Sequence, residues 1–327
     1  MTKVCIYGAG AIGGYLGAKL AGTSATVSLV ARGPHLAAIR QKGLTLIEDG
    51  ETSVHRVTAT DTPADLGVQD FVIVTLKAHS IPHVVKAMQP LLGPDTAVVF
   101  ATNGVPWWYF HGLEGEFADR RLETVDPGGV IWDGIGPDRA IGCVVYPATE
   151  ITSPGVVEHR SGNRFSLGEP SGEKTERVQV LADLLNACGL KAPVRPRLRD
   201  EIWIKLWGNA SLNPISALTG ATLAEMTADA GTAQVLRNIM VELQAVGEAL
   251  DARFSVSVDK RLAGAAAVGD HKTSMLQDLE AGRPMEIDAL VSAAQELGAL
   301  AGQPTPTLDT VLALVQQKAR LAGCYDG

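Results

Sequence analysis

The sequence contains few cysteines, no long apolar run and no cluster of basic residues, and each of these absences excludes a class of protein. Only four of the 327 residues are cysteine, none forms a C-x-x-C pair, and no histidine cluster lies near them. This argues against a zinc site, so we predict no metal and expect reduced, mostly buried thiols. No run of 18 apolar residues occurs, and no basic-then-apolar leader precedes the first strand pattern. We therefore expect a soluble, cytoplasmic protein without a membrane segment.

The charge and length bear on nucleic-acid binding and on the number of domains. The formal net charge is −8 and the pI is near 5.4, and Lys and Arg are not clustered, which argues against a nucleic-acid surface. With 46% hydrophobic residues, 327 residues are too many for one core of ordinary size. We expect two domains.

The first half of the chain alternates strand and helix patterns. Short β-rich runs lie at 3–7, 25–32, 70–78 and 96–104, with helical segments between them. Such alternation predicts a parallel, doubly wound α/β sheet that is covered on both faces. From 140 to 168 the β-rich stretches are separated by Ser-Pro-Gly and Ser-Gly-Asn turns, which is typical of hairpins at a sheet edge.

The second half has helical periodicity throughout. We predict helices at 175–188, 199–218, 229–250, 273–281, 286–301 and 307–321. The domain boundary is expected near residue 171, which gives an α/β domain at 1–171 and an all-helical domain at 172–327.

A glycine motif follows the first strand directly and precedes the first helix. It reads Gly8-Ala9-Gly10-Ala11-Ile12-Gly13. In a dinucleotide-binding fold the first glycine permits the turn, the second lets the backbone approach the pyrophosphate, and the third lets helix and strand pack closely. We predict a dinucleotide site; the alternative is a glycine-rich turn without a ligand.

Residues at the ends of the strands are further candidates for binding the cofactor. The second strand ends at Arg32, where NAD-binding folds usually carry an acidic residue, so we prefer NADP; the alternative is a solvated arginine. Lys77 and Asn103 follow the next two strands, at the carboxyl ends where such sheets bind ligands. Either residue could instead cap a helix or form a turn.

A polar stripe crosses the helix predicted at 199–218. Lys205, Asn209 and Asn213 are spaced four residues apart among bulky apolar neighbours. Taken alone, such a stripe is more often a solvated helix face or a row of inter-helix hydrogen bonds than an active site. Because burying an unpaired ammonium is unfavourable, we expect Lys205 to be paired or used. The segment 271–291, with Ser274 and Glu286, supplies the partner.

Five motifs in this order resemble the ketopantoate reductase family. They are GAGAIG, TLKA at 75–78, NG at 103–104, K-L-x-x-N-x-x-x-N-P at 205–214, and SMLQD followed by EID. The resemblance implies a Rossmann domain, a helical domain like that of 6-phosphogluconate dehydrogenase, and a substrate cleft between the two. It also implies that Lys205 donates a proton to the ketone oxygen while NADPH delivers hydride, and that Glu286 helps to hold the lysine and the cofactor. The resemblance assigns substrate contacts to Asn209, Asn213, Ser274 and Asn103, and cofactor contacts to the glycine motif, Arg32, Lys77, Asn103, Ala148 and Glu286.

Two features depart from the family pattern. The segment 105–132 is long and aromatic. Its aromatic side chains could line the nicotinamide side of the cleft or pack the insert onto the sheet; they are Trp107, Trp108, Tyr109, Phe110 and Trp132. Leu223 stands where the family has a substrate-contacting asparagine.

The leading functional hypothesis is an NADPH-dependent reduction of 2-dehydropantoate to (R)-pantoate, on the route to pantothenate and coenzyme A. The alternatives are a D-2-hydroxy acid dehydrogenase that acts on another branched or aromatic 2-keto acid, and a dinucleotide-binding redox sensor without turnover. The long helices at 229–250 and 307–321 could form a homodimer seam.

Overall fold

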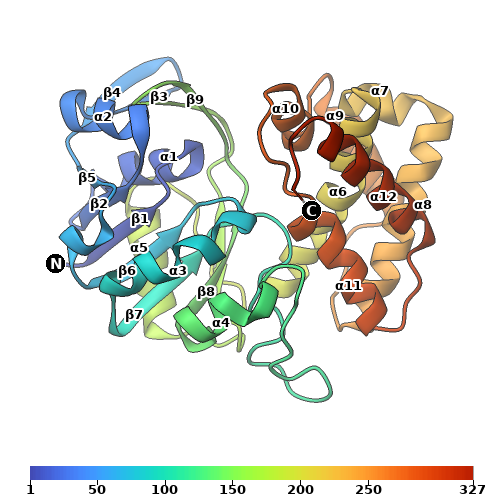
Figure 1. The fold of residues 1–327 in the computed structure, drawn as a ribbon, viewed down its shortest axis with the longest axis horizontal. Coiled ribbons are helices and arrows are strands. Elements are labelled where there is room, and N and C mark those ends of the chain that lie inside the picture. The colour runs from blue at the N-terminus through green and yellow to red at the C-terminus, as the bar shows by residue number, and fades with distance from the viewer. Residues whose placement is uncertain (327) are drawn as a thin grey trace. The chain divides into compact units, whose positions relative to one another are not determined.

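The computed structural model describes residues 1–326, which form two compact units (Figure 1). The first unit holds Met1–Thr102, Pro106–Arg121 and Asp126–Leu198; the second holds Asn103–Val105, Leu122–Val125 and the chain from Arg199 onward. The predicted fold class, a parallel α/β sheet followed by helices, is confirmed. The division between the units lies later than the boundary that we predicted near residue 171. The reason is that helix α5 (Glu176–Ala187) packs its apolar face into the core of the first unit.

The first unit is built on a seven-stranded sheet with the order β11-β8-β7-β6-β1-β2-β5. All neighbours pair in parallel except β11 with β8, which are antiparallel but not consecutive in the chain. The hairpin predicted at the Ser-Pro-Gly turn is formed instead by β9 (Ala148–Ser153) and β10 (Val156–Ser161), at the edge of a second sheet. The strands are β1 (Lys3–Tyr7), β2 (Thr26–Val30), β5 (Thr58–Thr60), β6 (Gln69–Val74), β7 (Leu92–Phe100), β8 (Ala140–Val145) and β11 (Phe165–Gly168).

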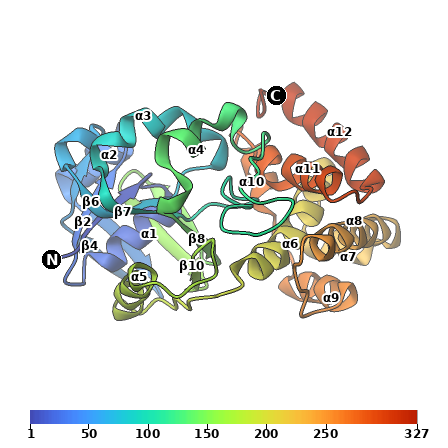
Figure 2. The same cartoon turned by 90° about the horizontal axis from the view of Figure 1, so that it is seen from below.

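Helices cover both faces of this sheet, as the apolar strands require. Val4 and Ile6 point to the face that shares a core with helices α1 (Ala11–Leu20) and α5, while Cys5 between them points to the opposite face. Figure 2 shows α3 (Val85–Met88) and α4 (Val130–Ile135) on one side of the sheet and α1 and α5 on the other. Helix α2 (Gly33–Lys42) follows β2 and adds Leu36 and Ile39 to the core.

A second, four-stranded sheet packs against α1. Its order is β4-β3-β10-β9. The strands are β3 (Leu44–Glu48), β4 (Glu51–His55), β9 (Ala148–Ser153) and β10 (Val156–Ser161). Two glycines of α1 let the sheets approach closely, because a Cβ at Gly14 would lie 2.6 Å from Val157 Cγ2 and one at Gly17 would lie 2.6 Å from Leu29 Cδ2.

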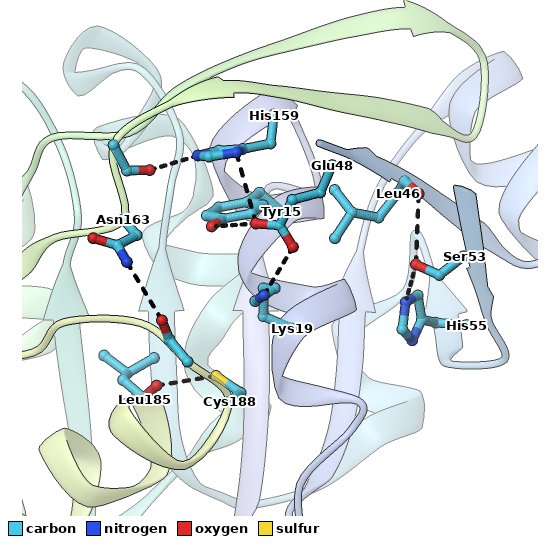
Figure 3. A network of polar contacts seen from close by, with 12 residues as sticks. Tyr15, Lys19, Leu46, Glu48, Ser53, His55, His159, Asn163, Leu185 and Cys188 are labelled. Atoms are coloured by element: carbon cyan, nitrogen blue, oxygen red, sulfur yellow. Dashed lines mark hydrogen bonds and ion pairs between the residues drawn. The ribbon is translucent and has the colours of Figure 1, made fainter. Parts of the chain in front are cut away.

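A polar cluster ties α1 to this second sheet (Figure 3). Tyr15 Oη donates to Glu48 Oε1 over 3.1 Å, and Lys19 Nζ lies 2.9 Å from Glu48 Oε2. The His159 ring stacks on the Tyr15 ring at 4.8 Å between centroids. Burial alone would raise the pKa of Glu48, but the bonds from Lys19 and Tyr15 hold it below its usual range. Burial, helped by the Glu48 charge, raises the pKa of Tyr15. The helix that carries the glycine motif is therefore held at two successive turns.

The second unit is helical. Its elements are α6 (Leu198–Thr219), α7 (Leu223–Ala228), α8 (Ala230–Ala249), α9 (Val258–Val268), α10 (Ser274–Glu280), the π-helix η7 (Asp288–Ser292), α11 (Ala293–Leu300) and α12 (Pro306–Leu321). Helix α8 packs against α7, α9, α11 and α12. Trp203 and Trp207 of α6 are fully buried, and Trp207 Nε1 donates to the carbonyl of Met240 over 2.5 Å.

Two short segments from the first half of the chain complete this unit. Val105 N donates to the carbonyl of Ala289 in η7 over 2.8 Å. The backbone amides of Glu123 and Thr124 donate to the two carboxylate oxygens of Glu296 in α11, over 2.9 and 3.0 Å. Both segments are thus fixed to helices that follow them by more than 150 residues in the sequence.

The aromatic insert packs into the first unit. Trp107, Trp108, Tyr109 and Phe110 are each at most 3% exposed. The Trp107 ring meets the rings of Phe100 and Trp132 edge-on, at 5.2 and 5.8 Å between centroids. Trp107, Trp108, Tyr109 and Phe110 therefore pack the insert within the first unit, as the alternative predicted. A place for the half-buried Trp132 on the nicotinamide side stays a prediction.

The cysteines and the helix lengths agree with two further expectations. All four cysteines are free thiols, and Cys5, Cys143 and Cys324 are buried. Burial raises the pKa of Cys5 to about 12, which makes it an unreactive thiol. Within residues 1–326, no helix combines the length and the apolar character needed to cross a bilayer.

Candidate active site

The glycine motif forms a tight turn between β1 and α1. Gly8 has a φ of +105°, which favours glycine, and a Cβ at this position would lie 2.6 Å from Leu76 Cδ2. At Gly13 a Cβ would overlap the carbonyl oxygen of Gly8 and the hydroxyl of Thr75. At Gly10, by contrast, the Cβ position has no atom within 4 Å. The turn is thus closed at its first and third glycines and open at its second, as a dinucleotide pyrophosphate requires.

The amino terminus of α1 points its dipole at this opening. The helix begins immediately after Gly10, and no side chain caps it. Its first turn also has no acidic residue. A phosphate is the ligand that such a terminus favours, through its amides and its positive dipole end. The residues present therefore fit the predicted dinucleotide.

The strand register brings the other cofactor candidates of the first unit to the same edge. Tyr7 pairs with both Val30 and Val74, so β1, β2 and β6 end in one row. Arg32 lies two residues beyond β2, is exposed, and is the residue before α2. Lys77 lies three residues beyond β6 and is half-buried.

Ala148 also follows the carboxyl end of a strand, three residues beyond β8, and it begins β9. It is half-buried. Its contact with a cofactor stays a prediction.

Thr75 also shapes the glycine turn, and His35 ties α2 to the turn between β9 and β10; the sequence reading singled out neither residue. Thr75 Oγ1 donates to the carbonyl of Gly8 over 2.5 Å, and this threonine opens the TLKA motif. His35 of α2 accepts from Gly155 N through Nδ1 over 3.0 Å, and burial lowers the pKa of His35. The neutral imidazole is thus the form that fits here. Nothing in the local sequence of His35 signals this position.

In the helical unit, Lys205 is joined to Asn103 and Glu286. Lys205 Nζ donates to Asn103 Oδ1 over 2.7 Å, and Asn103 Nδ2 donates to Glu286 Oε2 over 3.3 Å. All three side chains are half-buried. The Asn103 amide therefore accepts a hydrogen bond from the ammonium and donates one to the carboxylate, so both of its polar atoms are bonded. The prediction that Lys205 is paired is confirmed.

Asn103 is held in place by its neighbour. Gly104 has a φ of +88°, and a Cβ there would overlap the carbonyl of Ala289 in η7. Only glycine lets the chain lie this close to η7. The Asn-Gly pair thus lies in a bend of the chain, and this bend presents the Asn103 side chain to Lys205.

The remaining stripe residues occupy different environments. Asn209 is half-buried beside Lys205 on α6, whereas Asn213 is 5% exposed and lies just before Pro214 within the helix. Ser274 is the first residue of α10 and is exposed. Leu223, where the family pattern has an asparagine, is buried at the start of α7. Substrate contacts by Asn209, Asn213 and Ser274 stay predictions.

The Lys205 group can act as an oriented proton donor. An ammonium has three N–H bonds, and Asn103 uses one of them. A cation presented to a ketone oxygen stabilises the negative charge that develops during reduction and can supply the proton. A glycine turn shaped for a dinucleotide in one unit and an oriented ammonium in the other are the parts of a dinucleotide-dependent oxidoreductase.

Comparisons with known proteins agree with this class. Residues 4–172 match the family model "Ketopantoate reductase PanE/ApbA", and residues 197–319 match "Ketopantoate reductase PanE/ApbA C terminal". The chain is 60% identical over 324 residues to a 2-dehydropantoate 2-reductase of Mesorhizobium japonicum, with 99% of each chain covered. The chain therefore belongs to the ketopantoate reductase family, which is a family of oxidoreductases.

Solved structures share the fold over the full length. A protein of Ralstonia solanacearum assigned as a ketopantoate reductase superposes with a TM-score of 0.94 at 43% identity, covering 99% of this chain and 100% of that one. A D-mandelate dehydrogenase in complex with NADH and anilino(oxo)acetate has a TM-score of 0.83 at 21% identity, covering 98% and 99%. At that identity the similarity establishes a common fold.

Proposed function

We propose that this chain is an NADPH-dependent 2-dehydropantoate 2-reductase, which reduces the ketone of 2-dehydropantoate to (R)-pantoate for pantothenate and coenzyme A synthesis. The observation that carries the proposal is the Glu286–Asn103–Lys205 hydrogen-bonded chain. It is supported by the 60% identity to a 2-dehydropantoate 2-reductase over nearly the full length.

The cofactor binds the first unit. The glycine turn holds the pyrophosphate, and Arg32 binds the 2′-phosphate that distinguishes NADPH from NADH. Lys77 and Ala148 make further contacts with the dinucleotide. When bound, NADPH supplies the hydride that adds to the carbonyl carbon. Cofactor binding is thus assigned to the first unit and substrate binding to the second, and Asn103 of the second unit serves both.

Lys205 acts as the general acid. Its ammonium lies at the ketone oxygen, stabilises the forming alkoxide and gives up a proton to it, while Asn103 and Glu286 keep Nζ in position. Asn209 and Asn213 donate to and accept from the substrate hydroxyl and carbonyl, because an amide can do both. Ser274 adds a further hydroxyl contact to the substrate.

A substrate screen followed by NADPH absorbance tests the proposal. The purified chain is assayed with 2-dehydropantoate, 2-keto-3-methylvalerate and phenylglyoxylate, and each assay is repeated with NADH. We expect the highest kcat/KM with 2-dehydropantoate and NADPH. Preference for phenylglyoxylate would instead identify a D-2-hydroxy acid dehydrogenase, and tight NADPH binding without turnover of any keto acid would identify a redox sensor.

A further inference from the structure

An arginine of helix α9 lies on the same face of α6 as Lys205. Positions 205 and 208 are three residues apart on α6, so they are neighbours on the helix surface, about 5–6 Å apart. Lys205 and Asn209 are half-buried on this face, but Gly208 is buried although it has no side chain of its own.

The guanidinium of Arg261 covers Gly208. The three atoms nearest to a Cβ built at Gly208 all belong to the Arg261 guanidinium group: Nη2, which such a Cβ would overlap, Cζ at 2.9 Å and Nε at 3.2 Å. The guanidinium therefore meets the flank of α6 with its Nη2 end, in the space that any larger residue at position 208 would fill. Arg261 is itself half-buried.

This places a permanent cation one helical turn from the proposed proton donor. In a 2-keto acid the carboxylate is bonded directly to the ketone carbon, so a site that presents Lys205 to the ketone oxygen brings the carboxylate close to the same stretch of α6. A guanidinium is the side chain that binds carboxylates best, through two parallel N–H bonds.

We propose that Arg261 binds the substrate carboxylate and thereby restricts the site to 2-keto acids rather than neutral ketones. This inference rests on the proposed function only in that the substrate is a 2-keto acid. In this proposal a residue of α9 recognises the charged end of the substrate, although α9 lies outside the five sequence motifs.

The experiment compares an acid with its neutral ester. The wild type and Arg261→Gln are assayed with NADPH against 2-dehydropantoate and its methyl ester, and binding of both compounds is measured by calorimetry with NADP⁺ present. We expect Arg261→Gln to raise KM for the acid about 30-fold, which is about 2 kcal/mol at 1.4 kcal/mol per tenfold, and to leave KM for the ester unchanged. Lys260→Gln, an exposed neighbour on α9, is the matched control and should leave the preference for the acid intact.

A second variant moves the guanidinium without removing it. In Gly208→Ala the methyl group displaces the end of a flexible side chain, and alanine favours the helix by up to about 1 kcal/mol, so α6 stays folded. KM for the acid should rise here too, by less than in Arg261→Gln. If Arg261→Gln affects acid and ester equally, or affects neither, the arginine only tethers α9 to α6 and the inference is wrong. A chain that binds the acid in calorimetry without reducing it would overturn the proposed function, while the comparison of acid with ester would still decide the role of Arg261.

Discussion

Replacement of Lys205 by methionine is the most direct test of the proposed chemistry. Methionine keeps an unbranched apolar stem of similar length and removes only the ammonium and its 2.7 Å bond to Asn103. A positioned general acid contributes about 10²- to 10⁴-fold in rate, so we expect kcat to fall about 10³-fold, which is about 4 kcal/mol at 1.36 kcal/mol per tenfold. Loss of one hydrogen bond costs about 1 kcal/mol, and removal of a half-buried charge offsets part of it. The free energy of unfolding should therefore change little.

The assay separates these effects. Single-turnover reduction gives the chemical step, calorimetry gives NADPH affinity, and urea denaturation gives stability; only the first should change strongly. Lys260→Met, on the exposed side of α9, is the control for a lost lysine charge. If Lys205→Met keeps kcat within about tenfold of wild type, the energy lost is too small for a proton donor and the mechanism is refuted. Asn103→Ala, which keeps the ammonium but removes its 2.7 Å bond to Asn103 Oδ1, should give a smaller loss of about tenfold.

Three further predictions concern the first unit. Gly13→Ala should abolish measurable NADPH binding in fluorescence titration, since the added methyl overlaps the Gly8 carbonyl; retained binding would mean that the turn does not hold the pyrophosphate. Arg32→Gln should raise KM for NADPH by about 10- to 100-fold and leave KM for NADH unchanged, because only NADPH carries the 2′-phosphate; equal effects on both would exclude Arg32 from that role. Because burial lowers the pKa of His35, its neutral form stabilises the fold fully above the unfolded value of about 6.5, and this contribution is lost as pH falls below that value through the folded pKa. Urea midpoints measured from neutral to mildly acidic pH should therefore decrease more for wild type than for His35→Gln, and parallel decreases would contradict the assignment.

The sequence predicted elements whose signal is local. The strand–glycine–helix order at 3–20 and the helices at 199–218 and 307–321 carry their pattern within one element, so they could be placed closely. Helix α9 was missed because its Ala/Gly-rich stretch at 263–269 shows no apolar periodicity. The β3–β4 hairpin was missed because its second strand, Glu51–His55, is polar and lies at the edge of its sheet.

The site was predictable only where a motif marks it. Lys205 could be expected to be paired, because an ammonium among apolar residues needs a partner, but 102 residues separate it from Asn103. The sequence placed the partner in the segment 271–291, whereas the structure shows Asn103 hydrogen-bonded to both Lys205 and Glu286. The contact of Arg261 with Gly208 and the bond of His35 to Gly155 depend on tertiary packing, and no spacing in the sequence encodes them.

The segments Asn103–Val105 and Leu122–Val125 limit how this protein can be taken apart. A fragment starting at Arg199 would lack the amides that bind Glu296, and its Lys205 would lose its partner amide. Exchange of helical domains between relatives would meet the same difficulty, because a transplanted C-terminal half would have to fit two loops of its host. Evolution of a new substrate preference in this chain is thus coupled to loops encoded before the midpoint of the sequence.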